Sequence, residues 1–275
     1  MVFFLACVGL LVLGYFTYGV FVEKVFGIDP NRKTPCMTRQ DGVDYIEMPT
    51  WKVFFIQLLD IAGLGPIFGP ILAALYGPSA LVWIVLGCIF AGAVHDYFSG
   101  MLSVRSGGKS IPEVVGDVMG MPARQTMRVF SVILLVLVGV VFILGPAKLL
   151  SNLTGFNVQL LVACIFLYYF SATVLPIDKI IVATNVHPGE KPIWPLLFIT
   201  LSCGAISGFH STQSPLMARC IRNEDKGRLV FYGAMIVEGI IGLIWATVGL
   251  SFYHGPEALS AVIASGSPAA VVNEA

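Results

Sequence analysis

Glu238 is the only charged residue in an apolar run, residues 229–250, that is long enough to cross a bilayer. A charged side chain at the centre of a membrane helix costs about 2.5 kcal/mol or more, so it usually serves a substrate path, an ion path or a proton relay. We therefore predict that Glu238 couples an ion, as a buried carboxyl that binds and releases a proton. The alternative is a protonated Glu238 that forms a hydrogen bond inside the helix bundle.

A second acid, Asp96, lies in the apolar run 80–102, directly after His95. It belongs to a stripe of small residues at spacing four, which lets a neighbouring helix approach closely; the other members are Cys88, Gly92 and Gly100. His95 and Asp96 point about 100° apart on a helix and need not share a partner. We predict that both take part in ion coupling. Alternatively, Asp96 pairs with Arg105 or Lys109 in the loop that follows.

Two apolar segments are interrupted by glycine and proline. Residues 61–70 hold three glycines and two prolines, and residues 202–215 add polar side chains to a similar pattern. Glycine and proline weaken or break a helix, and bare backbone at membrane depth occurs where it lines a cavity or is buried in protein. Paired interruptions of this kind indicate a transporter's binding site, although two kinked packing helices would also explain them.

These segments supply the remaining candidate residues. The predicted substrate-binding residues are Gly63, Gly65, Pro66, Gly69, Gly208, His210, Ser211, Thr212 and Gln213. Asp60, just before the first interruption, is a further candidate for ion coupling, and His210 is a possible second proton carrier because histidine titrates near neutral pH. We expect Gly65 and Gly208 to have non-helical backbone and to lie near each other in one cavity.

Composition places the chain in a membrane. Of its 275 residues, 57% are hydrophobic and 12% are charged, about half the charged share of a soluble domain. The formal net charge is zero, so no basic surface for nucleic acid is expected. The six cysteines form no CxxC pair, and no metal or cofactor motif appears. We expect no metal, no cofactor and no nucleic acid, and the lipid bilayer as the chain's surroundings.

The predicted fold is an all-α polytopic membrane protein with about seven transmembrane segments, two of them broken, in a single domain over 1–275. The segments are 2–22, 53–76, 80–102, 129–150, 157–175, 193–218 and 228–251. The first has no basic region before it and no cleavage site after it, so we interpret it as a retained span.

The loops 23–52 and 103–128 are rich in lysine and arginine and fall on the same side, which should be cytoplasmic. The basic residues of 219–228 then lie on the opposite side if the sixth segment crosses the membrane once. A re-entrant sixth segment would resolve this conflict. A miscounted span between 157 and 192 would also resolve it, and the sequence leaves both possibilities open.

Two sequence patterns suggest other functions. Gly107-Gly-Lys-Ser110 ends like a phosphate-binding loop, but the leading glycine position is Ser103 and no strand precedes it, so we exclude nucleotide binding. The segment Gly204-Ala-Ile-Ser-Gly208 would suit an intramembrane serine protease built on Ser207, which needs a histidine from another helix. A non-transporting membrane scaffold or sensor is a further alternative, in which Glu238 and the residues around His210 only pack.

Several motifs, in order along nearly the whole chain, resemble the carbon starvation protein A (CstA) family. They are Asp29-Pro-Asn-Arg-Lys-Thr-Pro35, Asp41-Gly-Val-Asp-Tyr45, Ile61-Ala-Gly-Leu-Gly-Pro-Ile-Phe-Gly-Pro70, Gly92-Ala-Val-His-Asp96, Leu175-Pro-Ile-Asp-Lys179 and Ile206-Ser-Gly-Phe-His-Ser-Thr-Gln-Ser-Pro-Leu-Met-Ala-Arg219.

The resemblance implies a multi-pass carrier in a bacterial or archaeal inner membrane that imports pyruvate or short peptides during carbon starvation, coupled to H⁺ or Na⁺. It also implies a relative of the LeuT-like (APC superfamily) fold with five-plus-five inverted repeats. Many members carry a His-His pair before the Ile-Ala-Gly motif, where this chain has Ile56 and Gln57. Members are also longer, so the chain is expected to be an N-terminal part of such a bundle, truncated at its C-terminus.

Overall fold

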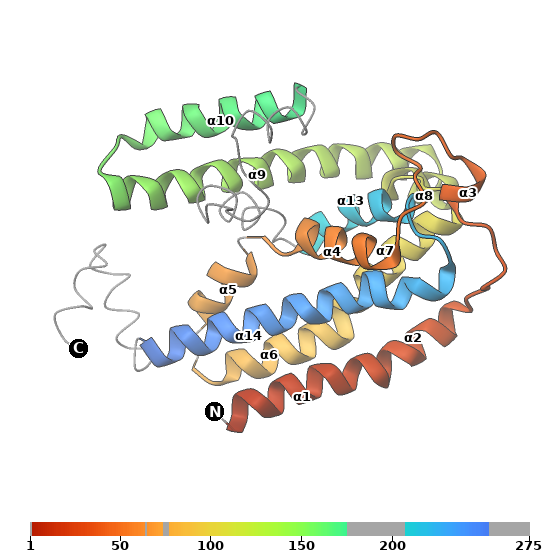
Figure 1. The fold of residues 1–275 in the computed structure, drawn as a ribbon, viewed down its shortest axis with the longest axis horizontal. Helices are drawn as coiled ribbons and strands as arrows, with labels where there is room; N and C mark the ends of the chain where they lie inside the picture. Colours follow the sequence, from red (N-terminus) through yellow and green to blue (C-terminus); the bar gives the residue numbers. More distant parts are fainter. Residues whose placement is uncertain (1, 64, 74–76, 175–206, 253–275) are drawn as a thin grey trace.

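A computed structural model describes residues 2–63, 65–73, 77–174 and 207–252, and the regular structure in these ranges is helical (Figure 1). The α-helices are α1 (Val2–Phe16), α2 (Tyr18–Phe26), α3 (Pro35–Thr38), α4 (Thr50–Ile61), α5 (Gly65–Ala73), α6 (Ser79–Gly87), α7 (Ala93–Arg105), α8 (Ile111–Met119), α9 (Met121–Thr154), α10 (Val158–Val174), α13 (Ser207–Ala218) and α14 (Ala234–Phe252). Two π-helical turns, η2 (Cys88–Gly92) and η4 (Arg228–Gly233), and the 3₁₀ turn η3 (Glu224–Lys226) complete the set.

Four of the seven predicted segments are confirmed as helices long and apolar enough to cross a bilayer. These helical stretches are Val2–Phe26, Ser79–Arg105, Met121–Thr154 and Glu224–Phe252. The fifth predicted segment forms α10, whose apolar part, Val158–Ser171, is shorter than a full span. The chain is therefore a multi-pass helical membrane protein.

The second predicted segment is broken, as expected. Its halves, Thr50–Ile61 and Gly65–Ile71, meet at an angle of 74°, with Ala62 and Gly63 outside both helices. The break is shorter than the glycine and proline pattern suggested, because Gly65 already begins α5 and Pro70 lies inside it. The expectation of non-helical backbone at Gly65 is therefore wrong. Pro66 is the second residue of α5. Its missing N–H costs no hydrogen bond there, because N–H groups in the first turn have no partner within the helix.

The sixth predicted segment behaves differently within the described residues. Residues 207–218 form the continuous helix α13, which contains Gly208 in its first turn and Pro215 near its end. The expectation of non-helical backbone at Gly208 is thus wrong as well. First-turn N–H groups have no partner within their own helix in any case, and membrane helices tolerate proline where neighbouring groups satisfy the freed carbonyl. Residues 193–206 lie outside the described part.

Helix α14 is the centre of the bundle and packs against α1, α4, α5 and α6, while α9 and α10 form a pair at one side (Figure 1). The predicted small-residue stripe lies at the contact with η4 and α14. A Cβ atom on Gly100 would come within 2.5 Å of the Phe231 ring, and one on Gly92 within 2.7 Å of Met235. Glycine is therefore required at position 100, where the ring is rigid, whereas at position 92 the flexible end of Met235 could move aside.

Three polar segments meet at one end of the bundle and are called the basic layer here: residues 27–49, 106–110 and 219–227. Arg219 pairs with Asp44 at 3.6 Å, Arg222 pairs with Glu47 at 2.9 Å, and Arg39 donates to the carbonyl of Gly107 at 3.0 Å. Residues 219–228 thus lie on the same side as the other basic loops. The positive-inside rule assigns this side to the cytoplasm, and the conflict in the sequence-based topology disappears.

Candidate functional site

Asp96, His210 and Glu238, which come from three different helices, meet in the interior. His210 Nδ1 lies 2.9 Å from Asp96 Oδ2, and His210 Nε2 lies 3.8 Å from Glu238 Oε2. The three residues are 0%, 2% and 5% exposed, respectively. The prediction that Asp96 and Glu238 face protein rather than lipid is confirmed. We call these three residues the buried triad.

His95 extends the buried triad toward the surface. Its Nδ1 lies 3.0 Å from Asp96 Oδ1, and its side chain is 43% exposed. Although neighbouring residues point apart on a helix, this imidazole reaches back to the carboxyl next to it. The alternative pairing of Asp96 with loop residues is wrong, because Arg105 pairs with Glu224 and Lys109 pairs with Asp117.

The two π-helical turns flank the triad and were not predicted. The turn η2 directly precedes the first turn of α7, which carries Asp96, and η4 directly precedes α14, which carries Glu238. A π-helical turn adds a residue to one turn of a helix, and such turns occur frequently at functional sites. No local sequence signal distinguishes them from an ordinary helix, so only the structure reveals them.

A hydrogen bond between Gln57 and Ser214 holds α13 against α4. Gln57 is fully buried, and its Nε2 donates to Ser214 Oγ at 3.2 Å. Gln57 stands where many relatives were expected to carry histidine. Here an uncharged amide takes that place. Its partner, Ser214, lies one turn after His210 on α13.

A cavity of about 340 Å³ connects the broken segment to the triad. Its walls come from the start of α5, from α6 with η2, and from α14. It is lined by Gly65, Pro66, Pro70, Trp83, Ile84, Gly87, Cys88, Ala91, Gly92, Met235, Glu238, Gly239 and Gly242. Glu238 is the only acid or base among these residues. The cavity is thus mostly apolar, with a single carboxyl in its wall.

The positions of the other predicted site residues do not test their predicted roles. Gly63 is buried at the break, whereas Gly69 is exposed on α5. Ser211, Thr212 and Gln213 lie on α13 beside His210, and Gln213 Nε2 donates to Thr212 Oγ1 at 3.1 Å. Asp60 is part of α4 and is not a member of the triad. The roles of these residues, and the proximity of Gly65 to Gly208, stay predictions.

Glu224 is a buried acid that the sequence reasoning missed. It accepts hydrogen bonds from the Asp29 N–H at 2.9 Å and from Arg105 Nε and Nη2 at 3.3 and 3.1 Å. Arg105 also donates to the carbonyls of Phe26 and Gly27. The cluster ties α2, α7 and η3 together at the basic layer. Its sequence signal is weak, since Glu224 is one charge among several in a short polar loop.

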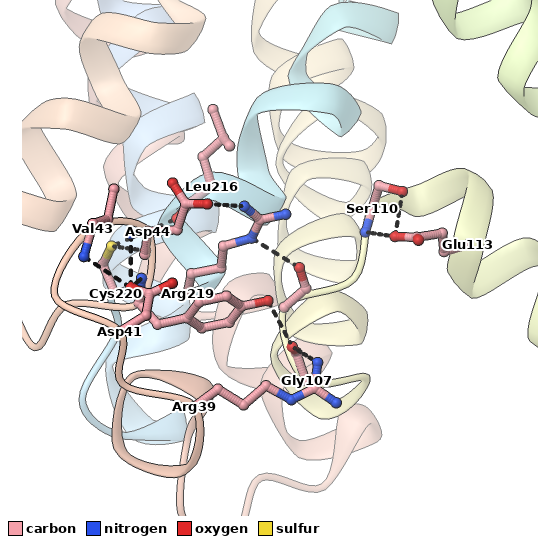
Figure 2. Close-up of polar contacts among 12 residues, drawn as sticks. Arg39, Asp41, Val43, Asp44, Gly107, Ser110, Glu113, Leu216, Arg219 and Cys220 are labelled. Atoms are coloured by element: carbon pink, nitrogen blue, oxygen red, sulfur yellow. Dashed lines mark hydrogen bonds and ion pairs between the residues drawn. The ribbon is translucent and has the colours of Figure 1, made fainter.

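The exclusion of a phosphate-binding loop at 107–110 agrees with the structure. The N–H groups of Ser106, Gly107 and Gly108 donate to carbonyls at the end of α7, so they cannot cradle a phosphate. Ser110 instead caps α8, where its N–H and hydroxyl both donate to the Glu113 carboxylate (Figure 2). Within the described residues, no group of three or more His, Cys, Asp or Glu side chains could hold a metal ion.

The family model described as "Carbon starvation protein CstA" matches residues 1–154 and 181–272. The chain belongs to the CstA family. A Haemophilus influenzae protein named "Uncharacterized membrane protein" is 43% identical over 354 aligned positions, covering 97% of this chain and 95% of that protein. The matched ranges include every residue of the triad, together with the cavity, whereas all of α10 falls in the unmatched interval, residues 155–180.

More distant relatives of this CstA-family chain carry functional names. The Escherichia coli pyruvate/proton symporter BtsT is 25% identical, with 87% of this chain and 47% of the symporter covered. The Escherichia coli peptide transporter CstA is also 25% identical, with 87% and 48% covered. The chain therefore spans about half the length of these two transporters. No solved structure matches the chain.

The functionally named relatives are transporters, and the chain is not an enzyme. The serine-protease alternative is therefore set aside. His210 is the histidine nearest to Ser207 in the sequence. In the structure it contacts Asp96 and Glu238.

Proposed function

We propose that this chain carries out proton-coupled import of a small organic acid such as pyruvate, or of short peptides, during carbon starvation. In this proposal the buried triad holds the coupling proton and the cavity beside Glu238 holds the substrate. The observation that carries the proposal is a buried histidine between two buried carboxyls, one of which lines a cavity at a helix break. The names of the distant relatives support the substrate class.

The charge balance of the triad favours a bound proton. With both carboxyls ionised and His210 neutral, the triad carries two negative charges in a region shielded from water. An isolated buried charge costs several kcal/mol unless it is paired or neutralised, so uptake of protons by the triad lowers its free energy. One proton on His210 leaves a single negative charge, and a second proton makes the triad neutral.

A substrate anion in the cavity would change this balance. Its carboxylate would add a negative charge next to Glu238, and a proton on the triad would offset that charge. The N-terminal end of α5 also borders the cavity through Gly65 and Pro66, and a helix N-terminus attracts anions. Substrate and proton would therefore bind together more favourably than either does alone, which is the requirement for symport.

His95 gives the triad a path to the surface of the helix bundle. Because its side chain is half-exposed and contacts Asp96, a proton would pass from His95 through Asp96 to His210 and then to Glu238. In this scheme His95 and Asp96 form the entry, and Glu238 is the group that responds to substrate. Asp60 is proposed as a further acid near the break, outside this path.

The proposed architecture is a single transmembrane domain over 1–275 with about seven segments, arranged as part of a LeuT-like inverted-repeat bundle. The 74° bend between α4 and α5 supports it, because transporters of that class bind substrate at broken helices. The substrate contacts proposed at Gly63, Gly65, Pro66, Gly69, Gly208, His210, Ser211, Thr212 and Gln213 belong to the same scheme.

The test is uptake in proteoliposomes with Glu238→Gln. The amide mimics a permanently protonated acid, so this variant is expected to lose uphill uptake driven by a proton gradient yet keep exchange of labelled for unlabelled substrate. Glu47→Gln, at an exposed ion pair in the basic layer, is the matched control and should behave like the unmodified chain. Concentration of substrate by Glu238→Gln against a gradient would show that Glu238 is structural.

The same vesicles separate the remaining possibilities. Labelled pyruvate is compared with a labelled dipeptide, each under an imposed proton gradient or an imposed sodium gradient. Uptake driven only by sodium would remove the triad from the coupling step and direct attention to carbonyls at the α4–α5 break. Absence of exchange with either substrate would favour a scaffold or sensor over a carrier.

A further inference from the structure

A second cavity, of about 370 Å³, lies in the basic layer. Its lining is mostly polar and basic, unlike the apolar lining of the cavity at Glu238. It is formed by the segment 32–39, which includes α3, and by the end of α7 with the turn that follows. Five basic side chains line it: Arg32, Lys33, Arg39, Arg105 and Lys109. No acidic residue is among its lining residues.

The positive charge of this basic cavity is only partly balanced. Arg32 and Arg105 share the single carboxylate of Glu224, and Lys109 pairs with Asp117. Within the described residues, neither Lys33 nor Arg39 forms an ion pair. Five cations thus face two carboxylates, which leaves about three uncompensated positive charges around one cavity.

The arrangement of Arg39 is suited to an anion. Its Nη1 donates to the Gly107 carbonyl, which fixes the guanidinium against the turn and leaves its other N–H groups for a ligand (Figure 2). Gly107 has a φ of 74°, and a Cβ atom there would come within 2.9 Å of Arg39 Cζ. A side chain at position 107 would therefore displace the guanidinium. Because a guanidinium fork matches the oxygens of a phosphate, a phosphate group is the anion it fits best.

We propose that this basic cavity binds the phosphate group of a phosphoester, either a phospholipid headgroup or a soluble phosphorylated compound. Its volume exceeds the room needed for an inorganic anion and falls within the range of small-molecule sites. It lies on the side that the positive-inside rule assigns to the cytoplasm, where basic pockets between helices meet anionic headgroups. Binding there would join the segment before α4 to the end of α7, independently of the transport reaction.

The decisive variant is the double substitution Lys33→Gln with Arg39→Gln, which removes the two cations without ion pairs and leaves an uncharged polar side chain at each position. The matched control is Lys24→Gln with Lys52→Gln, which removes the same charge from basic residues outside the cavity. All four side chains are exposed, so the variants should fold. The single variant Lys33→Gln provides a second check on folding, since it should purify as a folded, monodisperse protein.

Binding is measured on the purified full chain in two arms. In nanodiscs, phosphatidylcholine is compared with phosphatidylcholine containing phosphatidylglycerol, and bound lipid and thermal stability are recorded. In detergent, glycerol 3-phosphate is titrated instead. In one arm or the other, the unmodified chain and the control pair should bind and be stabilised. The double variant should bind roughly tenfold more weakly or worse, because two charge-assisted contacts are lost.

The arms also identify the source of the phosphate. A response only to phosphatidylglycerol assigns the cavity to a lipid headgroup, and a response to glycerol 3-phosphate assigns it to a soluble phosphoester. The proposal is overturned if neither ligand stabilises the unmodified chain. It is equally overturned if the double variant and the control pair lose binding to the same extent, because the effect would then be general surface charge.

Discussion

Replacement of Glu224 by glutamine should weaken the fold at the basic layer more than any comparable change of a surface acid. Glu224 is fully buried and accepts three hydrogen bonds, two from Arg105 and one from the Asp29 N–H. Glutamine keeps the shape, but it replaces one acceptor oxygen with an N–H₂ group. That group would face the guanidinium or the backbone N–H, and the charge on Arg105 would lose its partner.

The size of the effect follows from this geometry. Breaking a buried ion pair by removing one partner costs about 3–5 kcal/mol. Arg105 retains two carbonyl acceptors and its contact with the Phe26 ring, and its side chain is 26% exposed, which satisfies part of its charge. We therefore expect a loss of about 2–3 kcal/mol, at or just below the lower limit of that range.

The measurement is thermal unfolding in detergent micelles, with Glu47→Gln as the control. For chains of 150–250 residues a change of 1 kcal/mol moves the melting temperature by about 2–4 °C, so Glu224→Gln should lower it by roughly 4–12 °C. The pair of Glu47 with Arg222 is 44% and 45% exposed, and such a pair contributes about 0–1 kcal/mol. Equal losses in the two variants would show that Glu224 is not an anchor of this layer.

Two further substitutions test other parts of the structure. Gly100→Ala should destabilise the chain and reduce proton-driven uptake, because its Cβ would press on the Phe231 ring. Gly139→Ala, which meets no atom within 4 Å, should be neutral or stabilising by up to about 1 kcal/mol in the same unfolding and uptake assays. Hydrogen bonds from Ser110 hold the pKa of Glu113 below its ordinary value, so its contribution to stability is present above the ordinary glutamate pKa and is lost as the pH falls through the lower folded value. Glu113→Gln does not titrate, so its melting temperature should fall less between pH 6 and pH 3 than that of the unmodified chain; an equal fall in both would contradict this assignment.

The sequence was sufficient for the membrane class, for four spans and for the break before α5. Each of these features depends on local composition, either a long apolar run or glycine and proline close together. Gly65 and Gly208 show the limit of such reasoning, since both lie in the first turns of helices, although the glycine and proline pattern suggested non-helical backbone there. Local sequence indicates that a break is possible and does not locate it to the residue.

The members of the triad were predicted separately, and their meeting was not. Asp96 and Glu238 were identified because carboxyls are rare in apolar runs, and His210 because it lies in a polar, glycine-rich segment. Asp96 and His210 are 114 residues apart, and nothing in a single sequence indicates that their helices touch. The π-helical turns η2 and η4 likewise have no sequence signature. Long-range placement is a property of the packed bundle, in which the contact of Gly100 with the Phe231 ring sets how closely α7 approaches η4.

The position of Gln57 bears on how the triad could work. Its amide donates to Ser214 and joins the half-helix α4 to α13, so a group that does not titrate fills the position where the family resemblance led us to expect histidine. Within the described part of the chain, the titratable groups that contact His210 or Asp96 include Glu238 and the half-exposed His95. In the proposed scheme, a proton taken up in this interior resides on one of these side chains or on His210 itself. For this reason Glu238→Gln, which leaves the Gln57–Ser214 bond untouched, isolates the coupling step from the packing of the half-helices.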